Sequence, residues 1–367
     1  MNSKFLANAT VAIFLCCVSS CKQHSDPKAA SSPPPPIESN QPSYYLFGAD
    51  TVTIEGRFQT HSDNSVTIAS AASNLSFVTS GTELQFSAAA EFEQSFIDVL
   101  VDGQLSLKAS RLEHNPSILN IRLGENPQEN HLVEIYNRGE PDSSVSRIIE
   151  LKTQHPITPY TKSSRKLMFI GASVTCGAVS EPDENCTVSQ ASHNGRVAHG
   201  TLIARALNAE SQLICRSGRG ILNGSLISVP QDAVHFLDYI VTPPDGPVYW
   251  DHRLFIPDGV LISLGNNDDL NNAAAFKNSY IALLSKLREL FPSATILLTE
   301  GPLIFGERKT QLTNYLQTVA TEVNDSKVSY IPSKRFPNSP CNDHPDAQTH
   351  EAIAKELLPL IKEKLGW

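Results

Sequence analysis

Short segments in which apolar and polar residues alternate follow one another between residues 44 and 153. Among them are LQFS (84–87), FIDVLV (96–101) and HLVEIY (131–136). A period of two is typical of strands with one buried face, and the turn pair Asp102-Gly103 separates two of these segments. About seven or eight such strands predict an all-β domain over residues 44–153, built as a β-sandwich or jelly roll.

The pattern changes in residues 165–367, where short apolar runs alternate with segments whose apolar residues recur every three or four positions. The apolar runs are 167–170, 211–215, 259–264, 295–299 and 328–331, and the helical segments are 195–207, 273–290, 309–323 and 350–365. This alternation predicts an α/β domain in which a parallel sheet is flanked by helices. Residues 154–164, which contain Pro156 and Pro159, are expected to form an extended link between the two domains.

The first 20 residues have the pattern of a secretory signal peptide. Lys4 precedes an apolar run, Phe5 to Val18, that is too short to span a bilayer. The sequence VSSC (18–21) resembles a bacterial lipobox, in which Cys21 would receive the lipid; the alternative is ordinary signal cleavage with an incidental cysteine. Because Lys22 rather than aspartate follows Cys21, the resemblance to envelope lipoproteins predicts an outer-membrane location.

Residues 21–43 are rich in serine and proline and lack the apolar residues needed for a core, so they are expected to form a tether. No other apolar stretch is long enough to cross a bilayer, and the lipid anchor is therefore the predicted membrane contact. The net charge is −9 and the sequence has no Lys/Arg block, which argues against a nucleic-acid partner. The sequence does not indicate an oligomeric state.

The chain has seven cysteines, of which Cys16 and Cys17 would leave with the signal and Cys21 would be lipidated. The other four are Cys176, Cys186, Cys215 and Cys341. In an oxidising compartment they allow three sets of pairs, and the sequence does not choose between them. None is spaced as C-x-x-C, so no zinc site is predicted.

The first of four stretches with candidate chemistry is Gly171-Ala172-Ser173, at the end of the first strand of the α/β domain. In parallel sheets, ligands bind at the carboxyl ends of the strands. Thr175 occupies the final glycine position of G-x-S-x-G, so the nucleophile elbow of α/β-hydrolases is excluded. A serine at this edge can still use backbone N–H groups of the following turn to stabilise an anion.

The second stretch, CRSGRG (215–220), exposes backbone N–H groups at Gly218 and Gly220, and its glycine spacing does not match a dinucleotide-binding loop. It follows the second strand, so Ser217 is expected at the same sheet edge as Ser173.

The third stretch, LGNNDD (264–269), brings Asn266, Asn267 and Asp268 to the end of another strand, where they can act as hydrogen-bond donors and acceptors. The alternative is a helix start capped by Asp268 or Asp269.

The fourth stretch, CNDHPDAQTH (341–350), leads into an amphipathic terminal helix. His344 is a candidate base, and Asp346 or Thr349 could cap the helix. His344 and His350 are also considered as metal ligands, but no third ligand is nearby, so neither a metal nor another cofactor is predicted.

Blocks containing Ser, Gly, Asn and His, in this order at successive strand ends, resemble the SGNH (GDSL) hydrolases. The chain is most similar to carbohydrate esterase family 2, in which a jelly-roll domain precedes an SGNH domain. The matching motifs are GASVTCG (171–177), Trp250-Asp251 before GVLISLGNND (259–268), and C-x-x-H-P (341–345). Residues 131–140 and 195–210 also resemble that family, so the resemblance extends from residue 44 to the C-terminus.

The resemblance implies a role for each block. Ser173 would attack an ester carbonyl, and His344 would accept its proton and later return it to the sugar alcohol. The N–H groups of Ser173 and Gly218 and the side-chain amide of Asn267 would form the oxyanion hole. Gly220 is the alternative to Gly218. Supporting roles are expected for Asp268 and Trp250.

Two positions depart from the family pattern. Ala172 replaces the usual aspartate before the nucleophile, and Cys341 stands where many SGNH enzymes have the aspartate that orients the histidine. A Ser173–His344 dyad is therefore expected, with a backbone carbonyl orienting the imidazole. A Cys176–Cys341 bridge could brace such a site; a Cys176–Cys186 bridge or buried free thiols are the alternatives.

The predicted function is that of a serine esterase that removes O-acetyl groups from a plant-type polysaccharide, xylan or glucomannan. One alternative is an SGNH protein that binds glycans without hydrolysis, because Ala172 lacks the acid. Another is an SGNH esterase that acts on a lipid or a thioester.

Overall fold

The computed structural model describes residues 44–45, 51–161, 163–222, 232–241, 246–336, 341 and 343–367. The predicted signal peptide, the lipidation candidate Cys21 and the tether lie outside these residues. Within the described ranges, no helix is long and apolar enough to cross a membrane.

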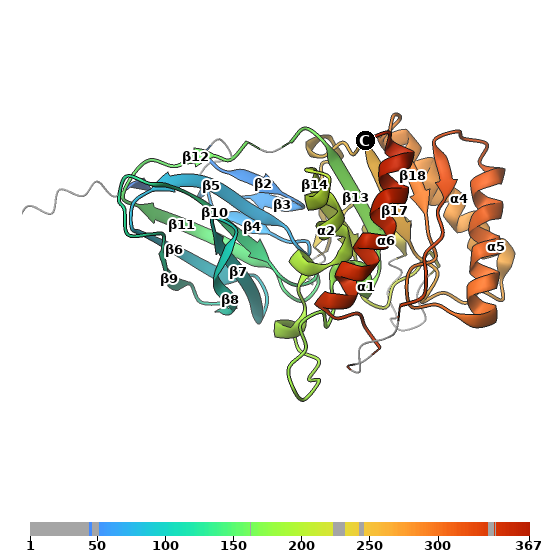
Figure 1. Cartoon of the computed structure of the whole chain (residues 1–367), viewed down its shortest axis with the longest axis horizontal. Helices are drawn as coiled ribbons and strands as arrows, with labels where there is room; N and C mark the ends of the chain where they lie inside the picture. The colour runs from blue at the N-terminus through green and yellow to red at the C-terminus, as the bar shows by residue number, and fades with distance from the viewer. Residues whose placement is uncertain are drawn as a thin grey trace, which may run out of the picture. The chain divides into compact units, whose positions relative to one another are not determined.

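Twelve strands form the N-terminal part. They are β1 (Tyr44–Tyr45), β2 (Thr53–Glu55), β3 (Phe58–Thr60), β4 (Val66–Ile68), β5 (Asn74–Ser80), β6 (Glu83–Ala90), β7 (Gln94–Val101), β8 (Gln104–Glu113), β9 (Ser117–Arg122), β10 (Asn130–Asn137), β11 (Ser146–Thr153) and β12 (Thr158–Pro159). One antiparallel sheet has the order β3-β4-β11-β6-β9, with β1 on β11, and the other has the order β12-β5-β10-β7-β8, with β2 on β5 (Figure 1).

The two antiparallel sheets share one apolar core, so this part is a β-sandwich. Phe86 of β6 and Phe77 of β5 come from different sheets and are both fully buried in that core. Asp102 and Gly103 both have positive φ and join β7 to β8 in a tight turn, as the sequence predicts.

A third sheet, which is parallel, has the order β14-β13-β17-β18-β19. Its strands are β13 (Lys166–Gly171), β14 (Glu210–Cys215), β17 (Gly259–Ser263), β18 (Thr295–Leu298) and β19 (Val328–Tyr330). The other elements are α1 (Ser173–Cys176), η1 (Gln190–Ser192), η2 (Gly195–Val197), α2 (His199–Ala206), α3 (Ala233–Phe236), β15 (Tyr239–Val241), β16 (Val248–Tyr249), η3 (His252–Leu254), α4 (Ala273–Leu290), α5 (Gly306–Glu322) and α6 (Ala347–Leu365).

Helices cover both faces of the parallel sheet, because successive side chains of a strand point to opposite faces. In β13, Phe169 packs into the cluster that holds residues of α2 and α6. Its neighbours Met168 and Ile170 pack into the cluster that holds residues of α4 and α5. The predicted parallel α/β architecture is confirmed, and α4 has the predicted bounds.

The helix predicted over residues 195–207 is interrupted. Residues 195–197 form the 3₁₀ turn η2, Ala198 is extended, and α2 begins at His199. Gly195 explains the break, because a Cβ there would lie 2.6 Å from the backbone nitrogen of Ala72 in the sandwich. The Gly195 N–H donates to the Arg138 carbonyl (2.9 Å). Packing against the sandwich therefore overrides the local helical pattern.

Two buried arginines of the sandwich bind the α/β domain. The Arg57 guanidinium donates to the carbonyls of Phe236, Leu237 and Tyr239. Burial lowers the pKa of Arg57 to about 9, which still leaves it charged at neutral pH. Arg138 forms an ion pair with Glu181, which follows α1 in the chain (2.7 Å).

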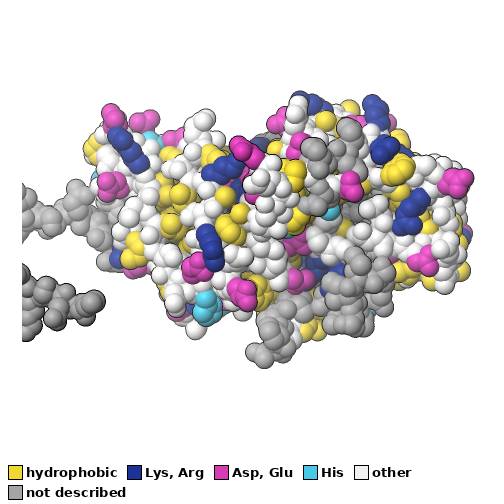
Figure 2. All heavy atoms as spheres, turned by 90° about the horizontal axis from the view of Figure 1, so that it is seen from below, with side chains coloured by type: hydrophobic (Ala, Val, Ile, Leu, Met, Phe, Trp, Pro, Cys, Tyr) yellow, Lys and Arg dark blue, Asp and Glu magenta, His cyan; other side chains and the backbone are white. Residues whose placement is uncertain are grey.

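On the face seen in Figure 2, positive and negative side chains are interspersed.

Candidate active site

Ser173 and His344 meet at the carboxyl edge of the parallel sheet. Ser173 is the first residue of α1, directly after β13, and His344 lies in the loop before α6. The Ser173 Oγ and His344 Nε2 are 2.8 Å apart, a hydrogen-bonding distance, although 171 positions separate the residues in sequence. A serine hydroxyl and an imidazole at this distance have the geometry that nucleophilic catalysis with a general base requires.

The loop after β14 is held by the sandwich domain. The backbone N–H of Ser217 donates to Glu140 (2.8 Å), and the Ser217 hydroxyl donates to the same carboxylate. Arg216 forms an ion pair with Asp142, which is close to Glu140 in sequence. Burial raises the pKa of Glu140, while the two hydrogen bonds from Ser217 lower it, and the net shift is upward. Gly218 follows the anchored serine directly.

Asp268 connects the second and third sequence blocks. Its carboxylate accepts hydrogen bonds from the backbone N–H groups of Ile221 (3.1 Å) and Leu222 (2.6 Å). A Cβ on Gly220 would lie 2.3 Å from the carboxylate oxygens, so this close approach requires glycine. Burial raises the pKa of Asp268, and the hydrogen bonds from these two N–H groups offset part of that increase.

The capping alternative for Asp268 and Asp269 is wrong. Asn272 caps α4, with its side chain accepting from the N–H of Ala275 (3.1 Å). Asp346, by contrast, does cap α6 by accepting from the N–H of Thr349 (2.8 Å).

Asn267 also contacts the second stretch, CRSGRG (215–220): its Nδ2 donates a hydrogen bond to the Arg219 carbonyl (2.9 Å). Both Asn267 and Ser173 line a small cavity of about 30 Å³. Ala172 and Glu300 line it too.

Glu300 is absent from the sequence-based site. Its buried carboxylate accepts from the Tyr330 hydroxyl (3.0 Å) and pairs with Lys309 (3.3 Å). Burial is the main reason why the pKa of Tyr330 is raised to about 12. The signal that could have revealed Glu300 is its position two residues after β18, at the same sheet edge as Ser173.

Trp250 lies outside this cavity. It is 5% exposed and packs edge-on against Phe58 of the sandwich, with ring centroids 5.5 Å apart. The Arg57 guanidinium lies 5.8 Å from the Trp250 ring. The structure therefore places Trp250 in the contact between the two domains.

His350 stacks on His199, with ring centroids 5.5 Å apart, and its Nδ1 accepts from the His199 backbone N–H (3.2 Å). Burial lowers the pKa of both histidines, that of His199 to about 4. Across the described ranges, no group of three His, Cys, Asp or Glu side chains could hold a metal.

The disulfides are Cys176–Cys215 and Cys186–Cys341. Both bridges considered from the sequence, Cys176–Cys341 and Cys176–Cys186, are therefore wrong. Pairing depends on strand order: β14 lies beside β13, which brings Cys215 to α1. One bridge ties the helix of Ser173 to the strand before Gly218, and the other ties a long loop to the segment of His344.

The comparisons agree with the observed architecture. The family model described as Carbohydrate esterase 2 N-terminal matches residues 54–159. An acetylxylan esterase / glucomannan deacetylase of Cellvibrio japonicus is 28% identical over 330 residues, which cover 86% of this chain and 89% of the relative.

Two solved structures are similar over most of the chain. A family two carbohydrate esterase from Cellvibrio japonicus has a TM-score of 0.81 and 25% identity, covering 89% of this chain and 99% of that one. A family two carbohydrate esterase from Clostridium thermocellum, in complex with cellohexaose, has a TM-score of 0.77 and 25% identity, covering 86% and 99%.

Proposed function

Since the chain belongs to carbohydrate esterase family 2 and is a carboxylic ester hydrolase, we propose that it removes O-acetyl groups from an acetylated polysaccharide, xylan or glucomannan. The observation that carries this proposal is the 2.8 Å contact between Ser173 Oγ and His344 Nε2. It lies beside a cavity of about 30 Å³, a size suited to an acetyl methyl group.

In the proposed reaction, Ser173 Oγ attacks the acetyl carbonyl while His344 Nε2 accepts its proton. The tetrahedral intermediate collapses, the C–O bond to the sugar breaks, and His344 returns the proton to the sugar oxygen. Water then attacks the acetyl-enzyme, again with His344 as base, and acetate and free Ser173 are released.

The oxyanion would be bound by the N–H groups of Ser173 and Gly218 and by Asn267. Asn267 Nδ2 carries two hydrogens, and one donates to the Arg219 carbonyl, so the second can face the oxyanion. We favour Gly218 over Gly220, because Gly218 follows the anchored Ser217, whereas Gly220 packs against the Asp268 carboxylate.

We propose that a backbone carbonyl orients His344. Cys341 occupies the position of the usual aspartate, and its sulfur is bonded to Cys186, so it cannot accept a strong hydrogen bond from the imidazole. The dyad would therefore work without a third acidic side chain.

We also propose that the β-sandwich is a jelly roll and that the mature protein is an outer-membrane lipoprotein attached through Cys21. The lipobox-like VSSC motif and the following Lys22 support the anchor.

The test is acetate release from 4-nitrophenyl acetate, acetylated xylan and acetylated glucomannan by the non-lipidated chain 22–367. Ser173→Ala and His344→Ala are each expected to lower kcat/KM by about 10³-fold or more. Ser285→Ala and His114→Ala, at exposed positions, are matched controls. An inactive but folded parent chain would contradict the esterase and favour glycan binding without hydrolysis.

A further inference from the structure

A cavity of about 630 Å³ lies between the sandwich and the α/β domain, away from Ser173. Ser211, near the beginning of β14, lines this cavity. Cys215, at the other end of the same strand, forms the disulfide with Cys176 of α1. Four residues of strand span about 13 Å. The cavity is therefore at the opposite edge of the parallel sheet from the proposed dyad.

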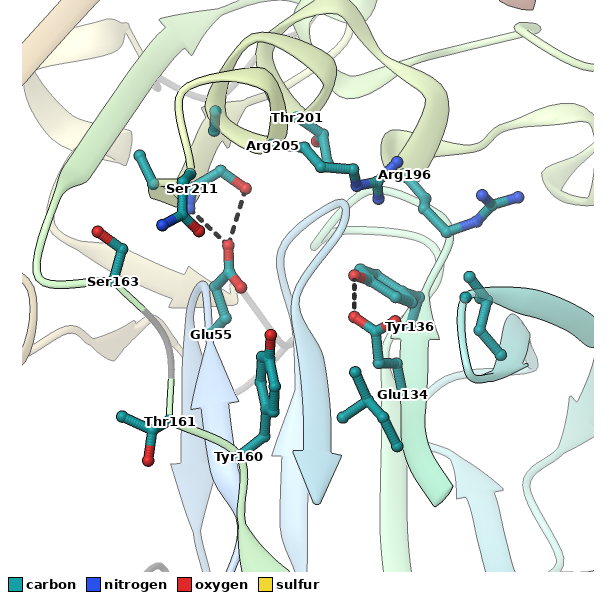
Figure 3. A pocket seen from close by; sticks show the side chains of 16 residues that line it. Glu55, Glu134, Tyr136, Tyr160, Thr161, Ser163, Arg196, Thr201, Arg205 and Ser211 are labelled. Carbon is teal, nitrogen blue, oxygen red and sulfur yellow. Dashed lines mark hydrogen bonds between the residues drawn. The ribbon is translucent and has the colours of Figure 1, made fainter. Parts of the chain in front are cut away.

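The charged groups around this cavity balance. Glu55 and Glu134 reach it from strands of the sandwich, and Arg205 comes from α2 (Figure 3). Arg196 of η2 also lines it, but its guanidinium points away from the two glutamates and pairs with Asp98 (3.0 Å). Two carboxylates and two guanidinium groups give no net charge. The lining residues therefore do not create a strongly positive or negative electrostatic potential that would favour a charged ligand over a neutral one.

The two carboxylates are fixed as hydrogen-bond acceptors. Glu55 accepts from the backbone N–H of Ser211 (2.5 Å) and from its hydroxyl (3.1 Å). Glu134 accepts from the hydroxyl of Tyr136 (2.8 Å). Glu55 also accepts from the side-chain amide of Asn74 (3.3 Å). Glu134 has lone pairs beyond the one used by Tyr136, so it can also accept from the hydroxyl groups of a ligand.

A donor and an aromatic ring complete the lining. The Arg205 guanidinium makes no hydrogen bond or ion pair within the described part of the chain, so its N–H groups are available. Tyr160 is 36% exposed and lies in Figure 3 between Glu55 and the Tyr136–Glu134 pair. Its backbone is held by the Thr53 hydroxyl, which donates to the Tyr160 carbonyl (2.5 Å).

We propose that this cavity is a second, non-catalytic binding site for a neutral oligosaccharide. A pyranose has hydroxyl groups that need both donors and acceptors and a C–H face that packs on an aromatic ring, and this lining offers all three. The volume is within the range of small-molecule sites, about 300–1,000 Å³. The choice of a carbohydrate rests on the proposed function, and the site would keep the polymer attached while acetyl groups are removed elsewhere.

The test is isothermal titration of chain 22–367 with cellohexaose and with xylohexaose. Tyr160→Ala and Arg205→Ala are expected to weaken binding of at least one of them by about tenfold. Tyr160→Phe, which keeps the ring, is expected to bind like the parent. Arg111→Ala, on the exposed side of β8, controls for loss of a surface arginine.

Hydrolysis of 4-nitrophenyl acetate, which is too small to reach both sites, should be unchanged in every one of these variants. Titration curves of Tyr160→Ala and Arg205→Ala that coincide with the parent curve would overturn the proposal. Tighter, Arg205-dependent binding of a glucuronic-acid-substituted xylohexaose would overturn the assignment to a neutral ligand. Oligosaccharide binding that depends on Tyr160 without any acetate release would refute the esterase proposal and leave this site intact.

Discussion

Glu140 of the sandwich accepts a hydrogen bond from the backbone N–H of Ser217 in the α/β domain, with 2.8 Å between oxygen and nitrogen. The Ser217 hydroxyl donates to the same buried carboxylate. The residue that follows is Gly218, whose N–H is a proposed oxyanion donor. The N-terminal domain therefore fixes the backbone of a loop that belongs to the other domain.

Replacing Glu140 should lower kcat more than it changes KM for 4-nitrophenyl acetate. Glu140→Ala leaves the Ser217 N–H without its acceptor, and we expect a loss in kcat of about 10- to 100-fold, less than the removal of an oxyanion donor itself. Glu140→Gln retains one acceptor oxygen and should recover part of the rate. Glu129→Gln, at an exposed position, is the control. An unchanged kcat in Glu140→Ala would show that Ser217 does not depend on this contact.

The Cys176–Cys215 bridge should contribute strongly to stability. It closes a loop with a sequence separation of 39 residues. The chain-entropy relation assigns about 3–4 kcal/mol to a loop of this length. We expect the Cys176→Ala/Cys215→Ala variant to lose that much free energy of unfolding in urea titrations at pH 7. A loss below about 1 kcal/mol would mean that the unfolded chain is not constrained by this bridge.

Stability should fall between pH 6.5 and pH 4 because of buried histidines. Burial, with a smaller contribution from the nearby His344, lowers the pKa of His193 to about 4. Below pH 6.5 the unfolded state therefore binds a proton that the folded state does not. The free energy of unfolding is unaffected by this histidine above pH 6.5, and it decreases as the pH falls from 6.5 toward 4.

His193→Asn tests this dependence. The Nδ1 of His193 accepts from the Val179 N–H (3.1 Å), and an asparagine oxygen can take over that role without titrating. Urea titrations at pH 7.0, 5.5 and 4.5 should give a shallower decrease for His193→Asn than for the parent. His114→Asn, at an exposed position, should follow the parent. Equal slopes for all three chains would contradict the assignment to His193.

The cavity beside Ser173 should limit the acyl group. Its volume of about 30 Å³ has room for about one methyl group or one water molecule. We expect kcat/KM for 4-nitrophenyl butanoate to be at least about tenfold lower than for the acetate. Leu303→Ala widens the cavity and should reduce this preference, whereas Leu254→Ala, at an exposed position outside it, should not. Equal rates for the two esters would favour the lipid or thioester alternative.

Features that depend on residues close together in the chain can be predicted from the sequence. Periods of two and of three to four residues located the strands and helices, and α4 has the predicted bounds because its apolar spacing is regular. Residues that follow strands were identified as candidates because the carboxyl ends of parallel strands share one edge. Ser173 and His344 were paired through the family motifs, and the structure brings them within 2.8 Å.

Features that depend on contacts between segments far apart in the chain become visible only in the folded protein. The Cys176–Cys215 pair follows from β14 lying beside β13, an order that no local pattern contains. The partnership of Glu140 with Ser217 and the burial of Trp250 against Phe58 both require the two domains to be in contact. Periodicity reports which face of an element is buried, but not which other element covers it. The partner is chosen by packing and by the pairing of buried polar groups across the whole fold.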